Sequence, residues 1–208
     1  MVSLSALSEA LQKGKADDVK KMVNQALEEK IPAKKVLEEG LIAGMDIIGG
    51  RFKRNEIYIP EVLIAARAMH AGMSILEPIL VKAGVKMIGK LAIGTVKGDL
   101  HDIGKNLVAM MYKGAGFEVL DLGVDVPADK YVKAAVEGAN IVGLSALLTT
   151  TMVGMKGVIE SLKEKGSKTK VIIGGAPVTQ NYADEIGASG YAADAASAVE
   201  IGKKLLSK

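Results

Sequence analysis

The stretch KLAIGTVKGDLHDIG, residues 90–104, decides the fold. Its Leu91-Ala92-Ile93 run is short and apolar, which is typical of a buried strand. A glycine-rich loop follows, and helical periodicity then extends from about Ile103 to Lys113. A strand followed by a loop and a helix is the repeating unit of parallel α/β sheets.

The same order recurs along the rest of the chain. Further strands are predicted over Phe117–Leu122, Ile141–Leu144, Val171–Ile173 and, more weakly, Gly190–Ala192, and helices over Pro127–Glu137, Met152–Lys165 and the C-terminus. This alternation predicts an α/β fold with a doubly wound, Rossmann-like parallel sheet that is covered on both faces. Ligands of such sheets bind beyond the carboxyl ends of the strands. Three loops are expected to meet there, namely Thr95–Gly104, Ser145–Thr151 and Gly174–Pro177.

The residues before this sheet follow a different pattern. Four apolar stripes at helical spacing begin near Ser3, Asp17, Pro32 and Pro60, and Gly49-Gly50 is expected to end the third helix. We therefore predict an N-terminal four-helix bundle over residues 1–86 and an α/β domain over residues 87–208. The segment Val81–Lys90 is the expected hinge.

The composition of the 208-residue chain excludes several classes of function. The chain is 49% hydrophobic and 25% charged with a formal net charge of +3, so nucleic acid is not an expected partner. The absence of cysteine excludes disulfides, thiolate metal sites and cysteine nucleophiles. Residues 1–15 hold no apolar run of signal-peptide length, and apolar runs elsewhere are of strand length. We therefore expect a cytoplasmic protein without a membrane span.

His101 lies between Asp99 and Asp102 in the first loop. One interpretation is a metal ligand whose second ring nitrogen is oriented by a carboxylate. The other is a solvated loop histidine beside a helix that Asp99 or Asp102 caps. The second histidine, His70, falls on a predicted helix and is read as an ordinary helix residue. A metal bound at His101 would then bring its other ligands with it, as a macrocyclic cofactor does.

A nucleotide phosphate is poorly supported at the same loop. From Gly98 to Gly104-Lys105-Asn106 five residues separate the glycines where a P-loop has four, and asparagine replaces the magnesium-binding hydroxyl residue. No G-x-G-x-x-G follows the first strand. These departures count against ATP and NAD.

The other two loops have ordinary explanations when each is taken alone. Ser145, Thr149 and Thr151 belong to a hydroxyl cluster that could cap a helix. Gly174-Gly175 could form a tight turn, although paired glycines also let a bulky ligand approach the backbone.

Together the loops resemble the cobalamin-binding signature Asp-x-His-x-x-Gly, Ser-x-Leu, Gly-Gly. In this chain the signature is Asp99, His101 and Gly104, then Ser145 and Leu147, then Gly174 and Gly175. The helical half resembles the cap domain of methionine synthase and of corrinoid methyl-carrier proteins. The stretches Ile59–Leu63 and Ala65–Met69 carry this second likeness, so the resemblance covers nearly the whole chain.

The resemblance implies roles for the α/β half. His101 would be the lower axial ligand of cobalt, Asp99 would hold its other ring nitrogen, and Thr151 would supply a hydroxyl to Asp99. Threonine stands at position 151 where methionine synthase has serine. The neighbours of this group in the histidine loop would contact the cofactor, namely Gly98, Leu100, Asp102, Ile103 and Gly104. Residues of the other two loops would line the pocket for its nucleotide tail, namely Ser145, Leu147, Thr149, Gly174 and Gly175.

The resemblance also implies roles for the helical half. Phe52, Ile59 and Val62 would cover the methyl face of the cobalt, with Glu38 on the same side. Isoleucine at position 59 replaces the leucine of methionine synthase, which keeps the apolar bulk. The cap would have to move aside during each transfer, so the hinge would be functional.

The implied function is transfer of a methyl group on cobalt. The cofactor would be cobalamin or a related cobamide in its methylcobalamin state, and His101 would leave the cobalt on reduction. The expected partners are a substrate-specific corrinoid methyltransferase, an acceptor methyltransferase that uses tetrahydrofolate or a thiol, and a reductive activator. The sequence contains no module for a methyl donor, folate or homocysteine, which favours a free-standing carrier that is not catalytic alone.

Three other interpretations compete with this one. A cobalamin-binding regulator or sensor without methyl transfer shares both halves, but the DNA-binding regulators also need a helix-turn-helix, which this sequence lacks. The small subunit of an adenosylcobalamin mutase would need a different upper face. A cofactor-free α/β domain of response-regulator type leaves the three ordered motifs unexplained.

Overall fold

The computed structural model describes residues 2–85 and 87–207. The chain divides into two compact units, Met1–Met87 with Gly114–Gly116, and Ile88–Lys113 with Phe117–Lys208. We call them the helical unit and the sheet unit and describe each by itself.

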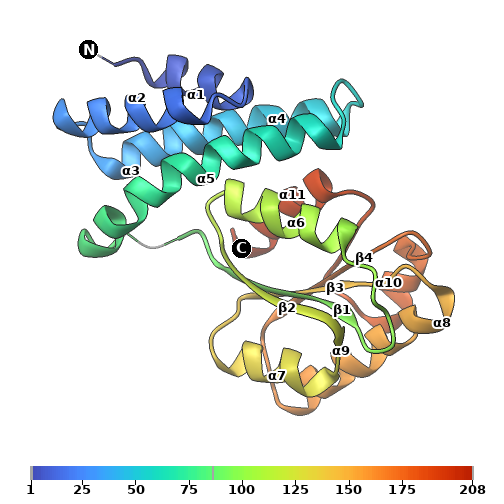
Figure 1. The fold of residues 1–208 in the computed structure, drawn as a ribbon. Helices are drawn as coiled ribbons and strands as arrows, with labels where there is room; N and C mark the ends of the chain where they lie inside the picture. Colours follow the sequence, from blue (N-terminus) through green and yellow to red (C-terminus); the bar gives the residue numbers. More distant parts are fainter. Residues whose placement is uncertain (1, 86, 208) are drawn as a thin grey trace. The chain divides into compact units, whose positions relative to one another are not determined.

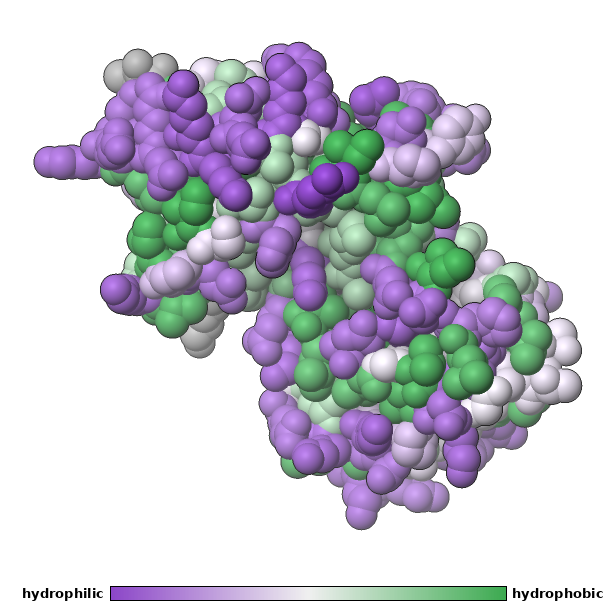
Figure 2. Space-filling model, viewed as in Figure 1, coloured by the Kyte–Doolittle hydropathy of each residue, from purple (hydrophilic) through white to green (hydrophobic). Residues whose placement is uncertain are grey.

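The helical unit consists of four helical rods (Figure 1). They are α1 (Leu4–Gln12), α2 (Ala16–Glu28), a continuous rod made of α3 (Ala33–Lys35), the π-helix η1 (Val36–Ile42) and α4 (Ala43–Lys53), and α5 (Ile59–Lys82). Their apolar stripes form the core, in which Leu7, Leu11, Val23, Leu41 and Leu76 are fully buried. The outward face of α1 and α2 is mostly hydrophilic (Figure 2), as expected of amphipathic helices around a core.

The third rod differs from its prediction. Gly49 and Gly50 lie inside α4, and the helix runs on to Lys53. A glycine ends a helix when it takes the left-handed conformation, and neither of these two does. Asn55 takes that conformation instead, with φ 58°, just beyond the true end. A buried Gly49 without a side chain is tolerated here because packing of the helix outweighs its low propensity.

Helix α5, Ile59–Lys82, covers the whole apolar stripe that the sequence predicted from Pro60 onward. The carboxylate of Glu61 accepts a hydrogen bond from the Tyr58 backbone N–H at 3.0 Å, which fixes its start. Within the described part of the chain it is the one helix long and apolar enough to cross a membrane. Of its most apolar stretch of 18 residues, 39% is buried. The expectation that apolar runs are of strand length did not identify this predicted helix as a candidate span. A single such helix is weak evidence for a span, because core helices have the same composition.

The sheet unit contains five parallel strands in the order β2-β1-β3-β4-β5. The strands are β1 (Lys90–Val96), β2 (Glu118–Val126), β3 (Ile141–Ser145), β4 (Lys170–Gly174) and β5 (Gly190–Ala192). The helices are α6 (Ile103–Gly114), α7 (Ala128–Val136), α8 (Thr149–Met152), α9 (Gly154–Glu164), α10 (Gln180–Ile186) and α11 (Ala195–Leu206). The predicted doubly wound α/β class is confirmed.

Helices cover both faces of this sheet (Figure 1). Residues of α7, α9 and α10 form one apolar layer around Tyr131, Val142 and Met155. On the other face lie α6 and α11, where the Tyr112 hydroxyl donates a hydrogen bond to the Ala198 carbonyl at 2.6 Å. Phe117 meets the Tyr112 ring edge-on at a centroid distance of 4.9 Å.

Three details of the sheet unit depart from the sequence prediction. Strand β2 continues past Leu122 to Val126, helix α10 was not predicted, and the helix expected from Met152 begins at Thr149 as α8. Helix α10 was missed because its seven residues carry two buried side chains, too few for a periodic signal.

The strand order reverses between β1 and β3. From β1 the chain passes to one side to form β2 and returns to the other side for β3, so their carboxyl ends flank a topological switch point. Open α/β sheets bind ligands at such a point. The loops that follow β1 and β3 carry Asp99, His101 and Leu147.

Candidate functional site

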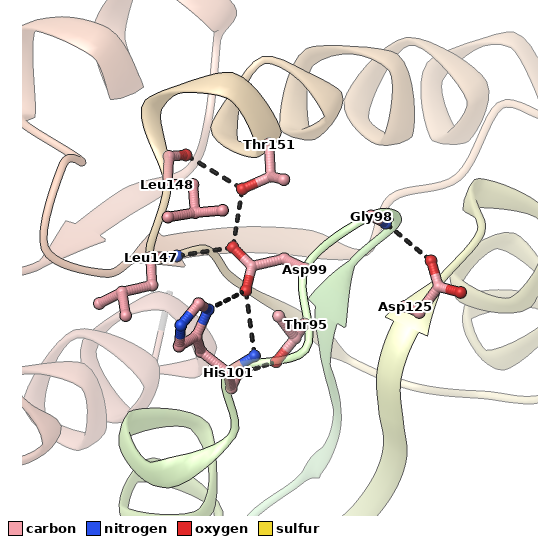
Figure 3. A network of polar contacts seen from close by, with 8 residues as sticks. All are labelled: Thr95, Gly98, Asp99, His101, Asp125, Leu147, Leu148 and Thr151. Atoms are coloured by element: carbon pink, nitrogen blue, oxygen red, sulfur yellow. Dashed lines mark hydrogen bonds and ion pairs between the residues drawn. The ribbon is translucent and has the colours of Figure 1, made fainter.

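A buried carboxylate joins these two loops (Figure 3). Asp99 is 0% exposed, and its Oδ1 faces the His101 ring Nδ1 at 2.7 Å and the His101 backbone nitrogen at 3.1 Å. Its Oδ2 accepts hydrogen bonds from the Leu147 backbone N–H at 2.8 Å and from the Thr151 hydroxyl at 2.7 Å. Four donors from two strand ends thus converge on one carboxyl group.

These bonds determine the charge of Asp99. Burial on its own would raise the pKa of this carboxyl group. The hydrogen bonds from Thr151, Leu147 and His101 outweigh burial and hold the pKa well below its usual range. Asp99 is therefore a carboxylate at neutral pH, and it acts as an acceptor for the ring of His101.

The His101 side chain is held on one side and open on the other. An ionised Asp99 assigns the ring proton to Nδ1, which leaves the lone pair on Nε2. The side chain is 52% exposed, and Nε2 points away from the network. The Thr95 hydroxyl donates to the His101 carbonyl at 2.8 Å and fixes the backbone. This is the geometry of an oriented metal-ligating imidazole.

The two acidic neighbours of His101 have different roles. Asp102 directly precedes α6 and accepts hydrogen bonds from Asn106 through its carbonyl at 2.7 Å and its Oδ2 at 3.0 Å. Asp99 does not cap that helix and binds the imidazole instead. The Asp102 side chain thus binds the side chain of Asn106 and not a backbone N–H of the helix, and the orienting carboxylate is Asp99. His70 lies exposed on α5.

The surroundings of His101 fit a flat apolar group. Leu100 and Ile103, on either side of the histidine loop, are 71% and 76% exposed, and Leu147 is 45% exposed. Exposed apolar side chains that gather at one edge are typical of a binding surface. Gly104 adds space, because a Cβ placed there would meet nothing within 4 Å. The residues present therefore fit a corrin ring above the histidine loop.

The other two motifs adjoin one another. Ser145 at the end of β3 pairs in register with Gly174 at the end of β4. A Cβ on Gly175, at φ 128°, would lie 1.8 Å from the Ala146 carbonyl oxygen. The close backbone contact that requires this glycine is thus with the protein itself. Thr149 is the first residue of α8, and its N-cap, Leu148, makes no side-chain cap, so helix capping does not explain the hydroxyl cluster.

The four residues predicted to face the methyl group lie in the helical unit. Phe52 is half-buried near the end of α4, and Ile59 is exposed at the start of α5. Val62 is fully buried, one turn further along α5. Glu38, in η1, lies 3.8 Å from the Lys34 ammonium group. Their roles toward a cofactor stay predictions.

The sequence reasoning missed several contributors to the site. The Leu147 backbone amide and the Thr95 hydroxyl have no sequence signature. Asp125 contacts the histidine loop from β2, with Oδ1 2.7 Å from the Gly98 amide nitrogen. Lys105, only 2% exposed, pairs with Asp121 at 2.6 Å. The sequence does show a lysine four residues after His101, in the Gly104-Lys105-Asn106 run, but this run was considered only as a failed P-loop.

Family comparison agrees with this geometry. Residues 89–200 match the family model described as a B12 binding domain, and residues 4–77 match a second model with the same description. Dimethylamine corrinoid protein 1 of Methanosarcina mazei is 48% identical over 208 residues, which cover 98% of this chain and 95% of that protein.

Two solved structures have the same fold. A crystal structure of a cobalamin-binding protein from Desulfitobacterium hafniense superposes with a TM-score of 0.81 at 33% identity and covers 99% of both chains. The methanol:cobalamin methyltransferase complex from Methanosarcina barkeri gives a TM-score of 0.87 at 30% identity, over 97% of this chain and 78% of that chain.

A loop histidine oriented by a buried carboxylate, on a doubly wound sheet with a helical partner unit, defines a B12-binding protein. Its cofactor is cobalamin or a related corrinoid. The chain belongs to the family of corrinoid proteins of anaerobic methyltransferase systems.

Proposed function

We propose that this chain carries a methyl group between a substrate:corrinoid methyltransferase and a second methyltransferase that uses tetrahydrofolate or a thiol as acceptor. The observation that carries the proposal is the His101 imidazole, oriented by Asp99 and open at Nε2. A bound corrinoid supplies a cobalt ion that can accept a methyl group and release it again.

The chain's own residues would hold and orient that cofactor. His101 would hold the cobalt of a bound corrinoid through Nε2, and the Asp99 carboxylate would keep the ring in position through Nδ1. Because Nδ1 donates to Asp99 whether or not Nε2 is occupied, the ring can release the metal without leaving its place. The Thr151 hydroxyl and the Leu147 amide would keep Asp99 ionised throughout.

The roles of the remaining site residues extend this proposal. Leu100, Ile103 and Gly104 would lie against the ring, with Gly98 and Asp102 in the same loop. Ser145, Leu147, Thr149, Gly174 and Gly175 would line the nucleotide-tail pocket. Phe52, Ile59, Val62 and Glu38 would face the methyl side.

Three partners are proposed. Relatives that are named as a dimethylamine corrinoid protein and as part of a methanol:cobalamin methyltransferase complex support a substrate-specific methyltransferase. An acceptor methyltransferase and a reductive activator complete the proposed set. We place the protein in the cytoplasm, without a nucleic-acid or membrane partner, as a carrier that is not catalytic alone.

The test is a visible spectrum of the full chain, reconstituted anaerobically with hydroxocobalamin and then reduced. A tightly held corrinoid is expected, with a Co(I) band that disappears on addition of a methyl donor and its methyltransferase. His101→Ala should alter the cobalt spectrum, whereas His70→Ala, on an exposed helix face, should not. An unchanged spectrum and transfer rate in His101→Ala would contradict the ligand role. Stable corrinoid binding without any methyl conversion would favour a regulatory or sensor module.

A further inference from the structure

The end of β2 has an unusual backbone beside the histidine loop. The register between β1 and β2 shifts twice, between Ile93 and Gly94 and between Gly94 and Val96. In this irregular stretch Asp125 adopts a left-handed conformation with φ 52°. Non-glycine residues in this region are uncommon, and they gather at functional sites because surrounding contacts hold them there.

Asp125 makes two hydrogen bonds to the loop that carries His101 (Figure 3 draws the side-chain bond). Its Oδ1 accepts from the Gly98 backbone N–H at 2.7 Å. Its own backbone N–H donates to the Asp99 carbonyl at 3.0 Å. The short backbone segment from the Gly98 N–H to the Asp99 carbonyl is therefore held at both ends, at the point where the chain turns with Gly98 at φ 85°.

We propose that Asp125 is a positioning residue for the cobalt-ligating His101. This inference rests on the proposed function, in which His101 binds the metal. The side chain of Asp99 is held by Leu147 and Thr151 from the β3 side, and Asp125 holds its backbone from the β2 side. Both constraints are needed to fix the carboxylate that orients the imidazole.

The neighbouring Asp121 shows why this is more than local turn stabilisation. Asp121 Oδ1 accepts from the Gly123 N–H at 2.9 Å, a bond between residues two apart within β2. The bond from Gly98 to Asp125 instead joins residues 27 apart in sequence. It ties the histidine loop to another strand, and its loss would free the loop rather than the turn.

Two properties of residue 125 matter, and substitutions separate them. Asparagine keeps an acceptor oxygen and tolerates the left-handed conformation. Glycine tolerates that conformation but has no acceptor. Alanine lacks the acceptor and also disfavours the conformation. Asp125→Asn is thus the conservative variant that should keep the bond to Gly98. Asp125→Gly removes that bond without straining the backbone, and Asp125→Ala removes it in a residue that disfavours the conformation.

The experiment has two readouts on the full-length chain. In the cofactor-free protein, hydrogen exchange of the Gly98 amide reports the bond itself. After loading with hydroxocobalamin and one-electron reduction of protein labelled with 15N-histidine, electron paramagnetic resonance reports the fraction of Co(II) with 15N coupling, which comes from a histidine and not from the cofactor's own 14N base. Exchange of the Ile172 amide, in the central part of β4, serves as the folding control.

We expect Asp125→Gly and Asp125→Ala to speed Gly98 exchange by about tenfold, and to lower the ratio of nitrogen-coupled to uncoupled cobalt by a similar factor. Asp125→Asn should match the wild type in both readouts. Ile172 exchange should not change.

Two results would overturn the inference alone. One is Gly98 exchange in Asp125→Gly that equals the wild type, and the other is an undiminished nitrogen-coupled fraction once the bond is lost. Absence of nitrogen coupling in the wild type, or its persistence in His101→Ala, would overturn the proposed function of His101 and this inference with it. The two failures are thus distinguishable.

Discussion

Two glycines of the B12-binding signature meet very different surroundings. A Cβ on Gly104 would point into open space, whereas a Cβ on Gly175 would collide with the Ala146 carbonyl oxygen. Gly175 also has φ 128°, a conformation that side-chain-bearing residues avoid. The fold itself requires Gly175, whereas at Gly104 it leaves room for a side chain, so the proposed contact with the corrinoid is what a substitution there would test.

Alanine substitutions should separate these two requirements. We expect Gly104→Ala to leave the free energy of unfolding unchanged or raise it by up to about 1 kcal/mol, since alanine favours a helix. Its corrinoid dissociation constant should rise at least about tenfold through crowding. Gly175→Ala should lose about 3 kcal/mol or more of stability. Urea unfolding and corrinoid titration measure both effects, and a corrinoid affinity unchanged in Gly104→Ala would contradict the ligand role of that glycine.

The hydroxyl of Thr151 stabilises a buried charge. Thr151→Val has nearly the same shape but removes one donor from the Asp99 carboxylate, so we expect a loss of about 2 kcal/mol in the free energy of unfolding. Thr151→Ser keeps the donor and deletes only a methyl group, so it should cost less than about 1 kcal/mol. Chemical denaturation of the cofactor-free protein is the measurement. Equal costs for the two variants would show that the hydroxyl does not act through Asp99.

Sequence could predict part of this network. His101, Asp99 and Thr151 were predicted through a resemblance, and the structure brings these three together. The backbone amide of Leu147 could not be predicted, because every residue has one and only the fold decides where it points. Asp125 was missed because a single aspartate before Val126-Pro127 reads as an ordinary turn residue.

At the scale of elements, the sequence predicted helices and strands correctly where the pattern of apolar residues was unbroken. Strand β1 and helix α6 follow their patterns closely. Gly49-Gly50 misled because a glycine pair is a breaker only when the backbone leaves the helical region. The extension of β2 was missed because Gly123 and Asp125 interrupt its apolar run, and the ladder with β1 forms there only by shifting register.

The ion pair between α6 and β2 should make stability depend on pH. Burial would raise the pKa of Asp121, but the bond from Lys105 and the nearby positive charges outweigh it and lower that pKa. The stabilisation is therefore complete above the unfolded value of about 4 and is lost as the pH falls toward the folded value.

Asp121→Asn removes this titration but keeps a hydrogen-bond acceptor. We expect the wild type to be more stable than the variant at pH 7 and the difference to shrink below about pH 4. Urea unfolding of both proteins at pH 7, 4 and 3 measures it, and Asp99, present in both, cancels in the comparison. A difference that stays constant over this range would contradict the assignment.

At the scale of the whole molecule, the prediction concerns the contribution of the helical unit to cofactor binding. The resemblance assigns Phe52 and Ile59 to the methyl side of the cofactor. We therefore expect corrinoid loading to slow amide exchange at the end of α4 and the start of α5. Exchange in α1, which contributes no residue to the proposed methyl side, should be unaffected. Hydrogen exchange with and without bound hydroxocobalamin tests this. Slowing that is confined to the sheet unit would remove these residues from the site.

The bond between Thr151 and Asp99 also has a consequence for biosynthesis. The two residues are 52 apart in sequence, and they meet only when β3 pairs with β1. While the ribosome is still extending the chain through this interval, Asp99 faces water and the imidazole of His101 has no fixed direction. Such non-local contacts form late, after the cost of closing the intervening loop. If these residues hold the cofactor as proposed, we expect a nascent chain to capture it only after translation has passed residue 151 and the sheet is assembled.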